Sequence, residues 1–126
     1  MTETNGFVER RKNQRYKVKD RSFAVLGPDA SRLCHMIDIC RAGLAFRYFV
    51  DADEPVGKNM ELGILAGDDF YLESIPARVV TEKTVESSSP FNAAIMKRRG
   101  VEFGLLTPKQ IKAIEYFIEN NTEGRV

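Results

Sequence analysis

The sequence has no marked excess of charge of either sign. Nineteen Lys and Arg residues against 18 Asp and Glu residues leave a net charge of +1 over 126 residues. A domain that binds nucleic acid through its general charge is usually strongly basic, so this balance argues against nucleic-acid binding. A site for an anion would therefore have to be local, made by a few residues gathered at one place.

Long apolar runs are absent and cysteines are few. No stretch approaches the roughly 18 apolar residues that span a membrane, and the N-terminal stretch MTETNGFVERRK lacks the apolar core of a signal peptide. We therefore expect a cytoplasmic protein with no membrane insertion. In that compartment Cys34 and Cys40 would be reduced thiols rather than a disulfide.

Patterns typical of enzymes and metal sites are also missing. The single histidine, His35, lies in a strand-like run, where a satisfied structural residue is commoner than a catalytic base. No nucleophile elbow, Walker loop or zinc-protease motif occurs. Cys34, His35 and Cys40 lie close in sequence, but adjacent strand residues point to opposite faces and a fourth ligand is lacking. We expect no catalytic residue, no metal ion and no cofactor.

What the sequence does contain is a series of short runs in which apolar and polar residues alternate. Such runs are typical of strands, and the 43% hydrophobic content is enough to build a core. Pro76 interrupts one run, which predicts a bulged or edge strand there. The expected strands are 16–26, 33–39, 44–49, 60–64, 70–84 and 98–106.

The period of two assigns faces within these runs. It places the odd-numbered residues of 33–39 on one face and Cys34, Met36 and Asp38 on the other. In the last run it places Leu105 on the same face as the apolar residues at 101 and 103.

The end of the chain changes to a helical period. Thr107, Pro108 and Gln110 form a capping-box arrangement, and isoleucines then recur at helical spacing. We therefore expect an all-β domain with six or so short, mostly antiparallel strands in a small barrel, followed by one amphipathic helix over about 108–120. A flexible tail would occupy residues 1–9, the domain residues 10–120, and a second tail residues 121–126.

Because the total charge is nearly neutral, a local concentration of positive charge is informative. One lies in the stretch ERRKNQRYKV, residues 9–18. A solvated basic tail is common near a terminus, but Arg15 directly adjoins the first expected strand, and Arg10 and Arg11 complete the cluster. The planar guanidinium group gives phosphates two parallel charge-assisted hydrogen bonds, and it can pair with the O6 and N7 edge of guanine. The cluster is therefore suited to a guanine nucleotide with several phosphates.

A second stretch, DICRAG at residues 38–43, ends the second expected strand. Asp38 could accept hydrogen bonds from the amino and imino groups of a guanine. Gly43 permits a backbone turn, or a close approach of ligand that a side chain would block. Strand ends often carry Asp and Gly, so this stretch gains meaning only beside the arginines.

Together the two stretches resemble the PilZ domain family. That family is marked by an R-x-x-x-R box before the first strand and a [D/N]-x-S-x-x-G box at the end of the second. Here Arg11 to Arg15 match the first box, and Asp38 to Gly43 match the second with one departure, Cys40 in place of serine. The stretch GVEF, 100–103, also looks like the last barrel strand of the family, and the resemblance covers about residues 9–119.

The resemblance implies a six-stranded antiparallel split β-barrel with a C-terminal helix, and a receptor for cyclic di-GMP without catalysis. Arg11 and Arg15 would bind the phosphates and guanine edges of the ligand, Asp38 would bind a guanine, and Gly43 would shape the loop against the ligand. In this family an arginine just before the first box favours a stacked pair of ligand molecules, and that position is Arg10.

Cys40 is the departure that bears on affinity. A thiol is larger than a hydroxyl and is a weaker hydrogen-bond donor and acceptor. If the family's serine bonds the ligand or locks the loop, the loss is about 0.5–1.5 kcal/mol, which is a few-fold to roughly tenfold in affinity. The arginine contacts would remain, so binding would be weakened rather than abolished.

The resemblance also implies a partner. Ligand binding would change the conformation of the arginine-rich segment and signal to an unidentified downstream protein, in pathways such as motility or biofilm formation. The alternative is a PilZ-like interaction domain that binds no nucleotide and acts through protein contacts alone. A monomer or a weak homodimer is compatible with the sequence.

Overall fold

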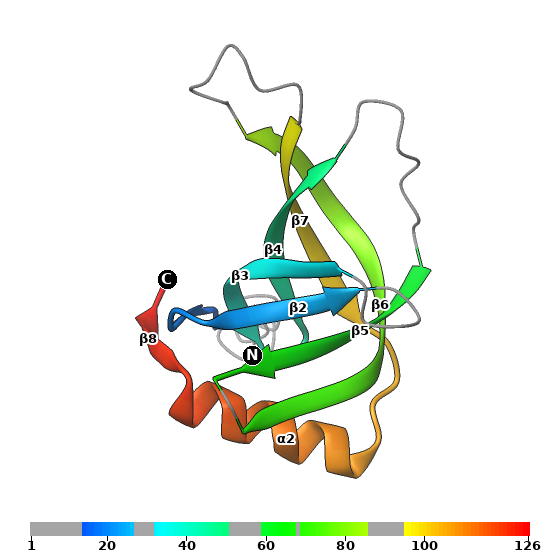
Figure 1. Cartoon of the computed structure of the whole chain (residues 1–126). Helices are drawn as coiled ribbons and strands as arrows, with labels where there is room; N and C mark the ends of the chain where they lie inside the picture. The colour runs from blue at the N-terminus through cyan, green and yellow to red at the C-terminus, as the bar shows by residue number, and fades with distance from the viewer. Residues whose placement is uncertain (1–13, 27–31, 51–58, 68, 86–94) are drawn as a thin grey trace, which may run out of the picture.

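The computed structural model describes residues 14–26, 32–50, 59–67, 69–85 and 95–126 (Figure 1). The expected tail at residues 1–9 lies outside the described residues. The elements in chain order are β1 (Tyr16–Val18), β2 (Ser22–Leu26), β3 (Arg32–Cys40), β4 (Gly43–Val50), β5 (Asn59–Ala66), β6 (Phe70–Val85), β7 (Ile95–Phe103), α2 (Pro108–Asn120) and β8 (Thr122–Arg125).

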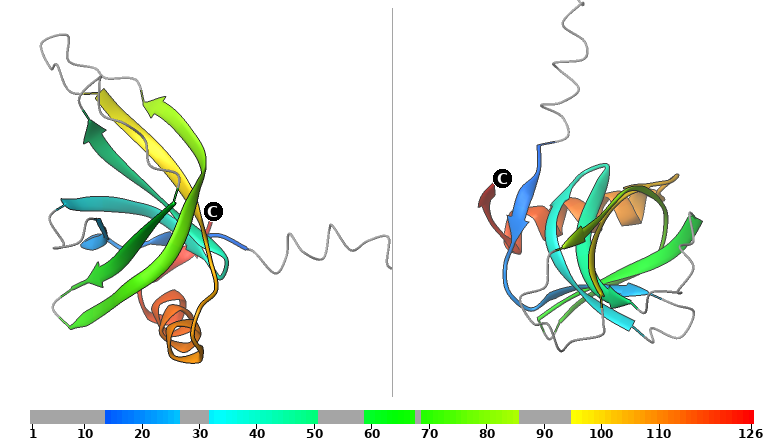
Figure 2. Two further views of the ribbon diagram at one scale, coloured as in Figure 1. Left: turned by 90° about the vertical axis from the view of Figure 1, so that its right-hand side faces the viewer. Right: turned by 90° about the horizontal axis from the view of Figure 1, so that it is seen from above.

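Six of the strands close into a barrel. They are hydrogen-bonded in the order β2-β5-β6-β7-β4-β3, and β3 pairs in turn with β2, so the sheet returns to its first strand (Figures 1 and 2). Every pairing is antiparallel. Closure leaves these strands no free edge, and it confirms the six-stranded antiparallel barrel with a C-terminal helix.

Two further strands extend the barrel where the sequence suggested otherwise. The first expected strand, 16–26, is interrupted by a turn in which Arg21 has a φ of +69°. As a result β1 pairs with the second half of β3, whereas β2 pairs with its first half. The expected C-terminal tail also differs, because Thr122–Arg125 form β8 and pair with β1.

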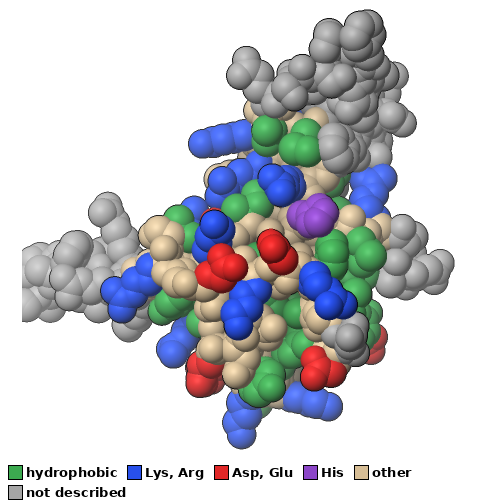
Figure 3. Space-filling view, turned by 60° about the vertical axis from the view of Figure 1, so that its left-hand side comes forward, with side chains coloured by type: hydrophobic (Ala, Val, Ile, Leu, Met, Phe, Trp, Pro, Cys, Tyr) green, Lys and Arg blue, Asp and Glu red, His purple; other side chains and the backbone are tan. Residues whose placement is uncertain are grey.

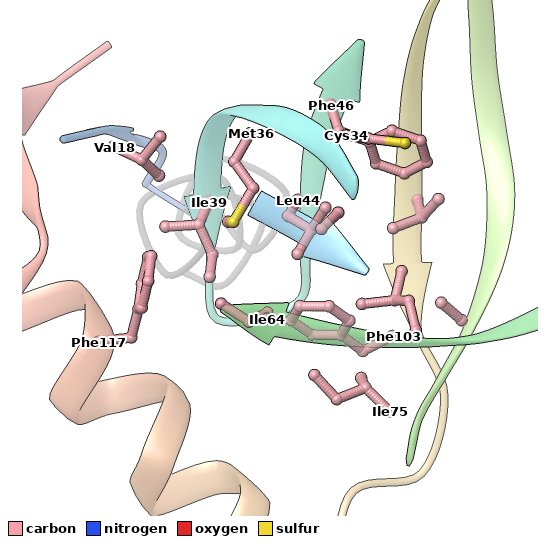
Figure 4. Close-up of a cluster of buried hydrophobic side chains, with 14 of the residues drawn as sticks. Val18, Cys34, Met36, Ile39, Leu44, Phe46, Ile64, Ile75, Phe103 and Phe117 are labelled. Atoms are coloured by element: carbon pink, nitrogen blue, oxygen red, sulfur yellow. The ribbon is translucent and has the colours of Figure 1, made fainter. Parts of the chain in front are cut away.

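The core fills the barrel interior and the gap between the barrel and α2. Buried isoleucines from β3, β5 and β6 belong to one cluster with Phe46 of β4, and Phe117 reaches from α2 toward Val18 and Ile39 (Figure 4). Phe117 and Ile114 are almost fully buried. The helix therefore covers one end of the barrel with the apolar stripe that its period predicted.

The helix begins as the sequence indicates. The Thr107 hydroxyl accepts a hydrogen bond from the Gln110 backbone N–H at 3.1 Å, and the Gln110 side chain accepts one from the Thr107 N–H at 3.0 Å. The capping box is confirmed. Ile111, expected in the apolar stripe, is 44% exposed, so the buried stripe is narrower than its sequence period suggests.

A β-bulge in β3 changes the faces that strict alternation assigned. Met36 is paired with Phe46 and Asp38 with Ala45, so Ile37 is an extra residue in β3. Cys34 and Met36 point inward before the bulge and Ile39 points inward after it. The prediction of one common face for all odd residues of 33–39 was wrong, because one inserted residue exchanges the faces of everything beyond it.

Two other strand predictions have different outcomes. A bulge with Ser74 at a φ of +59° precedes Pro76, so the prediction of a bulged or edge strand there is met by the first alternative, and β6 itself pairs with both β5 and β7. The last barrel strand ends at Phe103. Leu105 is therefore beyond it and 94% exposed, not on the buried face.

Candidate functional site

A cavity of about 510 Å³ lies on the outward-facing side of the strands β3, β4, β7 and β6. Its walls come from five segments that are far apart in the sequence but adjacent in the barrel. The lining residues are Arg15, Asp38, Cys40, Ala42, Gly43, Leu44, Ala45, Val80, Thr81, Arg98, Gly100, Val101 and Glu102.

The floor of the cavity is made by residues with little or no side chain. The register places Asp38 of β3 opposite Ala45 of β4, Ala45 opposite Gly100 of β7, and Gly100 opposite Thr81 of β6. The two central residues of this row, Ala45 and Gly100, are small and leave the sheet surface hollow. Asp38 and Thr81 lie on either side of this hollow. The cavity thus has a backbone floor and polar walls, a shape that admits a flat polar ligand.

Two β-bulges determine which side chains reach this hollow. The bulge at Ile37 in β3 puts Asp38 rather than its neighbour on the outward face. In β6, Val79 pairs with Val101 and Thr81 with Gly100, so Val80 is the extra residue. Bulges commonly redirect side chains beside binding sites, and here both flank the same cavity.

Asp38 is the charged group set deepest in the wall. Its side chain is 4% exposed, and Oδ2 accepts a hydrogen bond from Nη2 of Arg98 at 3.2 Å. Arg98 is itself 40% exposed and lines the same cavity. A buried carboxylate needs such a partner, and its position leaves it able to accept hydrogen bonds from a group inside the cavity.

Four of the residues that the sequence proposed are brought together here. Arg15, Asp38, Cys40 and Gly43 all line the cavity, although β1 and β2 lie between the first and the others in the sequence. The backbone carbonyl of Arg15 accepts a hydrogen bond from the Val126 N–H at 3.0 Å, which ties it to the end of β8. Arg10 and Arg11 lie outside the described residues.

The structure gives a reason for glycine at position 43 that the sequence did not reveal. Gly43 faces Glu102 in the β4–β7 pair, and a Cβ atom there would collide with the backbone carbonyl of Val101. Its absence of a side chain lets β7 approach β4 closely. Cys40, its partner across the tight Arg41–Ala42 turn, is a partly exposed free thiol.

Sequence reasoning missed part of the site. Arg98 and Thr81 belong to no recognised motif, and neither is close to Arg15 or Asp38 in sequence. Alternation before GVEF indicates that Arg98 and Gly100 share a face. Which side of the barrel that face joins depends on the register of β7 with β4 and β6, which the sequence does not give.

A different charged cluster lies on the inward side of the same strands. Nε of Arg99 donates to Oε2 of Glu82 at 2.8 Å, and the Tyr48 hydroxyl donates to the same oxygen at 3.0 Å. The Arg99 guanidinium also lies 4.5 Å from the centre of the Tyr48 ring. Burial by itself raises the pKa of Glu82, but the hydrogen bonds from Arg99 and Tyr48 and the charges of Arg99 and Lys97 outweigh it and leave that pKa below its ordinary value.

The described residues offer neither a metal cluster nor a membrane-spanning helix. In the five described ranges, no three His, Cys, Asp or Glu side chains gather closely enough to hold a metal ion. No helix within those ranges has the length and apolar character required to cross a membrane.

The chain matches the PilZ domain family over residues 9–120. The chain belongs to the PilZ domain family. The matched residues include the six barrel strands, the helix and the two stretches 11–15 and 38–43.

Solved structures share this PilZ fold. The PilZ domain with c-di-GMP of YcgR from Escherichia coli aligns with a TM-score of 0.67 at 12% identity, covering 89% of this chain and 91% of that one. MrkH, described as a c-di-GMP-dependent transcription regulatory factor, aligns with a TM-score of 0.62 at 10% identity, covering 84% of this chain and 48% of that one. Among curated proteins no relative matches. At such identities the likeness establishes the fold alone.

Proposed function

We propose that this PilZ domain is a cytoplasmic receptor that binds cyclic di-GMP in the cavity between β3, β4, β7 and β6, without catalysing a reaction. The observation that carries the proposal is the meeting of two separate boxes in one hollow: Arg15 from the first, and Asp38, Cys40 and Gly43 from the second. The YcgR domain, which has the same fold, is described with c-di-GMP bound.

The roles follow from the chemistry of each group. Arg15, with Arg10 and Arg11, supplies guanidinium groups for the two phosphates and the guanine edges. Asp38 accepts hydrogen bonds from the N1 and N2 donors of a guanine, while the hydrogen bond from Arg98 orients that carboxylate. Ala45 and Gly100 leave the floor of the cavity open for a planar base, and Gly43 lines the same cavity.

Signalling would follow from neutralising the arginines. A dianionic ligand held by Arg15 would fold the segment before it over the cavity and present a new surface to a downstream protein. Amide hydrogen exchange of residues 5–15 with and without cyclic di-GMP measures this directly. Unchanged protection in the saturated complex would exclude the mechanism, whatever the affinity.

Calorimetric titration tests the binding itself. Arg15→Ala removes one charge-assisted contact worth about 1.5–3 kcal/mol, so we expect affinity to fall by about 10- to 150-fold. Lys109→Ala, an exposed change on α2, is the matched control and should bind as the wild type does. A stoichiometry of two ligands per chain would support the role of Arg10 in favouring a stacked pair. No heat with the wild type would instead favour an interaction domain that binds no nucleotide.

A further inference from the structure

Three cations lie directly opposite one another on the outward face, next to the cavity. The register pairs Arg47 of β4 with Arg98 of β7, and Arg98 with Lys83 of β6. We call Arg47, Arg98 and Lys83 the cationic row. Like charges at directly opposed positions destabilise a sheet, so a row of three without an alternating carboxylate disfavours the fold when nothing is bound.

The row is incompletely neutralised within the described residues. Nη2 of Arg98 lies 3.2 Å from Oδ2 of Asp38, so this cation is paired. Arg47 and Lys83 are exposed, and no salt bridge joins either of them to another described residue. The nearby carboxylate of Glu82 points to the inward side, where Arg99 and Lys97 hold it. Two cations of the row are therefore available to an external anion.

Apolar side chains border the row. A smaller hollow of about 220 Å³ is lined by Arg32, Leu33, His35, Arg47, Tyr48 and Met96. Leu33 is 55% exposed at its edge, and His35 packs its ring 5.1 Å from that of Phe23. Figure 3 shows Lys and Arg side chains, with apolar ones, around the single histidine. The surface thus offers positive charge beside an apolar hollow.

We propose that this surface, the cationic row together with the hollow at Leu33 and Met96, docks an acidic segment of a partner protein that also carries apolar side chains. Arg47 and Lys83 are two strand spacings apart, about 10 Å, so one short peptide spans both. Carboxylates would pair with these two cations, and an apolar side chain would enter the hollow.

Charge and composition favour a protein partner over other anions. Nucleic-acid binding draws on an extended basic surface, whereas this chain has a net charge of +1. An exposed leucine beside the cations contributes little to binding of a phosphate backbone, whereas exposed apolar surface rimmed by polar residues is typical of protein interaction sites. Arg98 belongs both to the row and to the wall of the cavity, so ligand and partner would meet at one side chain. This last argument alone rests on the proposed function.

Selection from a random 12-residue peptide library displayed on phage, against the ligand-free full chain, tests the surface. We expect enriched peptides to carry several Asp or Glu residues with at least one large apolar residue. Their synthetic forms should bind Arg47→Glu/Lys83→Glu at least tenfold more weakly than the wild type. The control Lys109→Glu/Lys112→Glu makes the same change of net charge on α2, where both lysines are exposed, and should bind as the wild type does.

Each outcome decides the matter. Loss of binding in the row variant but not in the control supports the proposal, provided that Arg47→Gln/Lys83→Gln, a milder change, shows the same direction. The proposal would be overturned if no peptides were enriched or if the enriched peptides were not acidic. It would also be overturned if the row variant and the α2 control lost binding equally. Row-dependent binding only of duplex DNA or of phosphatidylserine vesicles would overturn it as well. Because the selection uses no cyclic di-GMP, its failure is distinct from a failure of the ligand titration.

Discussion

Arg98 and Arg99 are neighbours in the sequence, yet they belong to two different regions of the molecule. Arg98 is on the outward side, 40% exposed, where it holds Asp38 in the cavity wall. Arg99 is on the inward side, 7% exposed, where it is clasped by Glu82 and stacked on Tyr48. The same guanidinium group lines a cavity in one region and forms a buried ion pair in the other.

The difference teaches how a strand separates function from stability. Alternation sends consecutive side chains to opposite faces, so a single step along β7 moves a guanidinium from a cavity open to ligand into a nearly closed ion pair. The inward group is satisfied by partners within the barrel. The outward group, Arg98, has the Asp38 carboxylate as its partner, and both side chains line the cavity. Variants of the two regions should therefore affect different measurements.

Truncation of Arg99 should give the largest effect, and on stability. Arg99→Ala leaves the Glu82 carboxylate with less compensation in a mostly buried place, and we expect it to lower the free energy of unfolding by about 2–4 kcal/mol. Arg98→Gln, which keeps a hydrogen-bond donor for the buried Asp38 carboxylate, should lower it by about 1 kcal/mol or less, because the Arg98 side chain is partly solvated. Urea denaturation of both variants measures the two losses, and equal losses would contradict the division between the regions.

Truncation of Asp38 should act on ligand binding. Asp38→Ala removes the carboxylate proposed to bind guanine, and we expect cyclic di-GMP affinity to fall by about 10- to 100-fold. Asp38→Asn keeps one acceptor and should lose less. Calorimetry on the folded variants measures this. If Asp38→Ala bound as tightly as the wild type while Arg99→Ala did not, the two regions would have been assigned the wrong way round.

The inward cluster should also make stability depend on pH. The pKa of Glu82 is lowered in the folded protein, so its ionised form stabilises the fold above the unfolded pKa of about 4.3. That contribution is lost as the pH falls through the lower folded value. Urea denaturation between pH 7 and pH 3 should show a smaller decline for Glu82→Gln than for the wild type. Parallel declines would mean that Glu82 contributes nothing to it.

Restoring the family serine should give the smallest effect. Cys40→Ser exchanges a thiol at the cavity wall for a better hydrogen-bonding hydroxyl, and we expect affinity for cyclic di-GMP to rise by up to about tenfold, or 0.5–1.5 kcal/mol. Stability should change little, since Cys40 is only partly buried. Titration of this variant beside the wild type measures the gain, and no gain would show that the departure is harmless.

The fold was predictable to the extent that it depends on local chemistry. The capping box at Thr107 and the strand runs around Phe46 and Ile64 were read correctly, because capping bonds and alternating burial are made by residues near in sequence. The faces of 33–39 and the position of Leu105 were not. The position of a bulge or of a strand end depends on the lengths and registers of the partner strands. A single run of sequence does not give this information.

The site was predictable in part for the same reason. Arg15 and Asp38 fall in boxes whose chemistry suits a guanine nucleotide, and both line the cavity. Arg98 fell in no box, and its pairing with Asp38 spans 60 positions in the sequence. The sequence offered Gly43 as room for ligand, whereas the structure adds a close approach of β7 that leaves no space for a Cβ.

The sequence by itself determined the strand-rich class, the helix and its cap, and the two boxes, since these depend on residue types at short spacing. Only the tertiary structure decided that β3 meets both β1 and β2, that the last residues join as β8, and that bulges at Ile37 and Val80 open a cavity between them. The physical reason is that register and closure minimise the free energy of the whole barrel at once. No short stretch of chain carries that information.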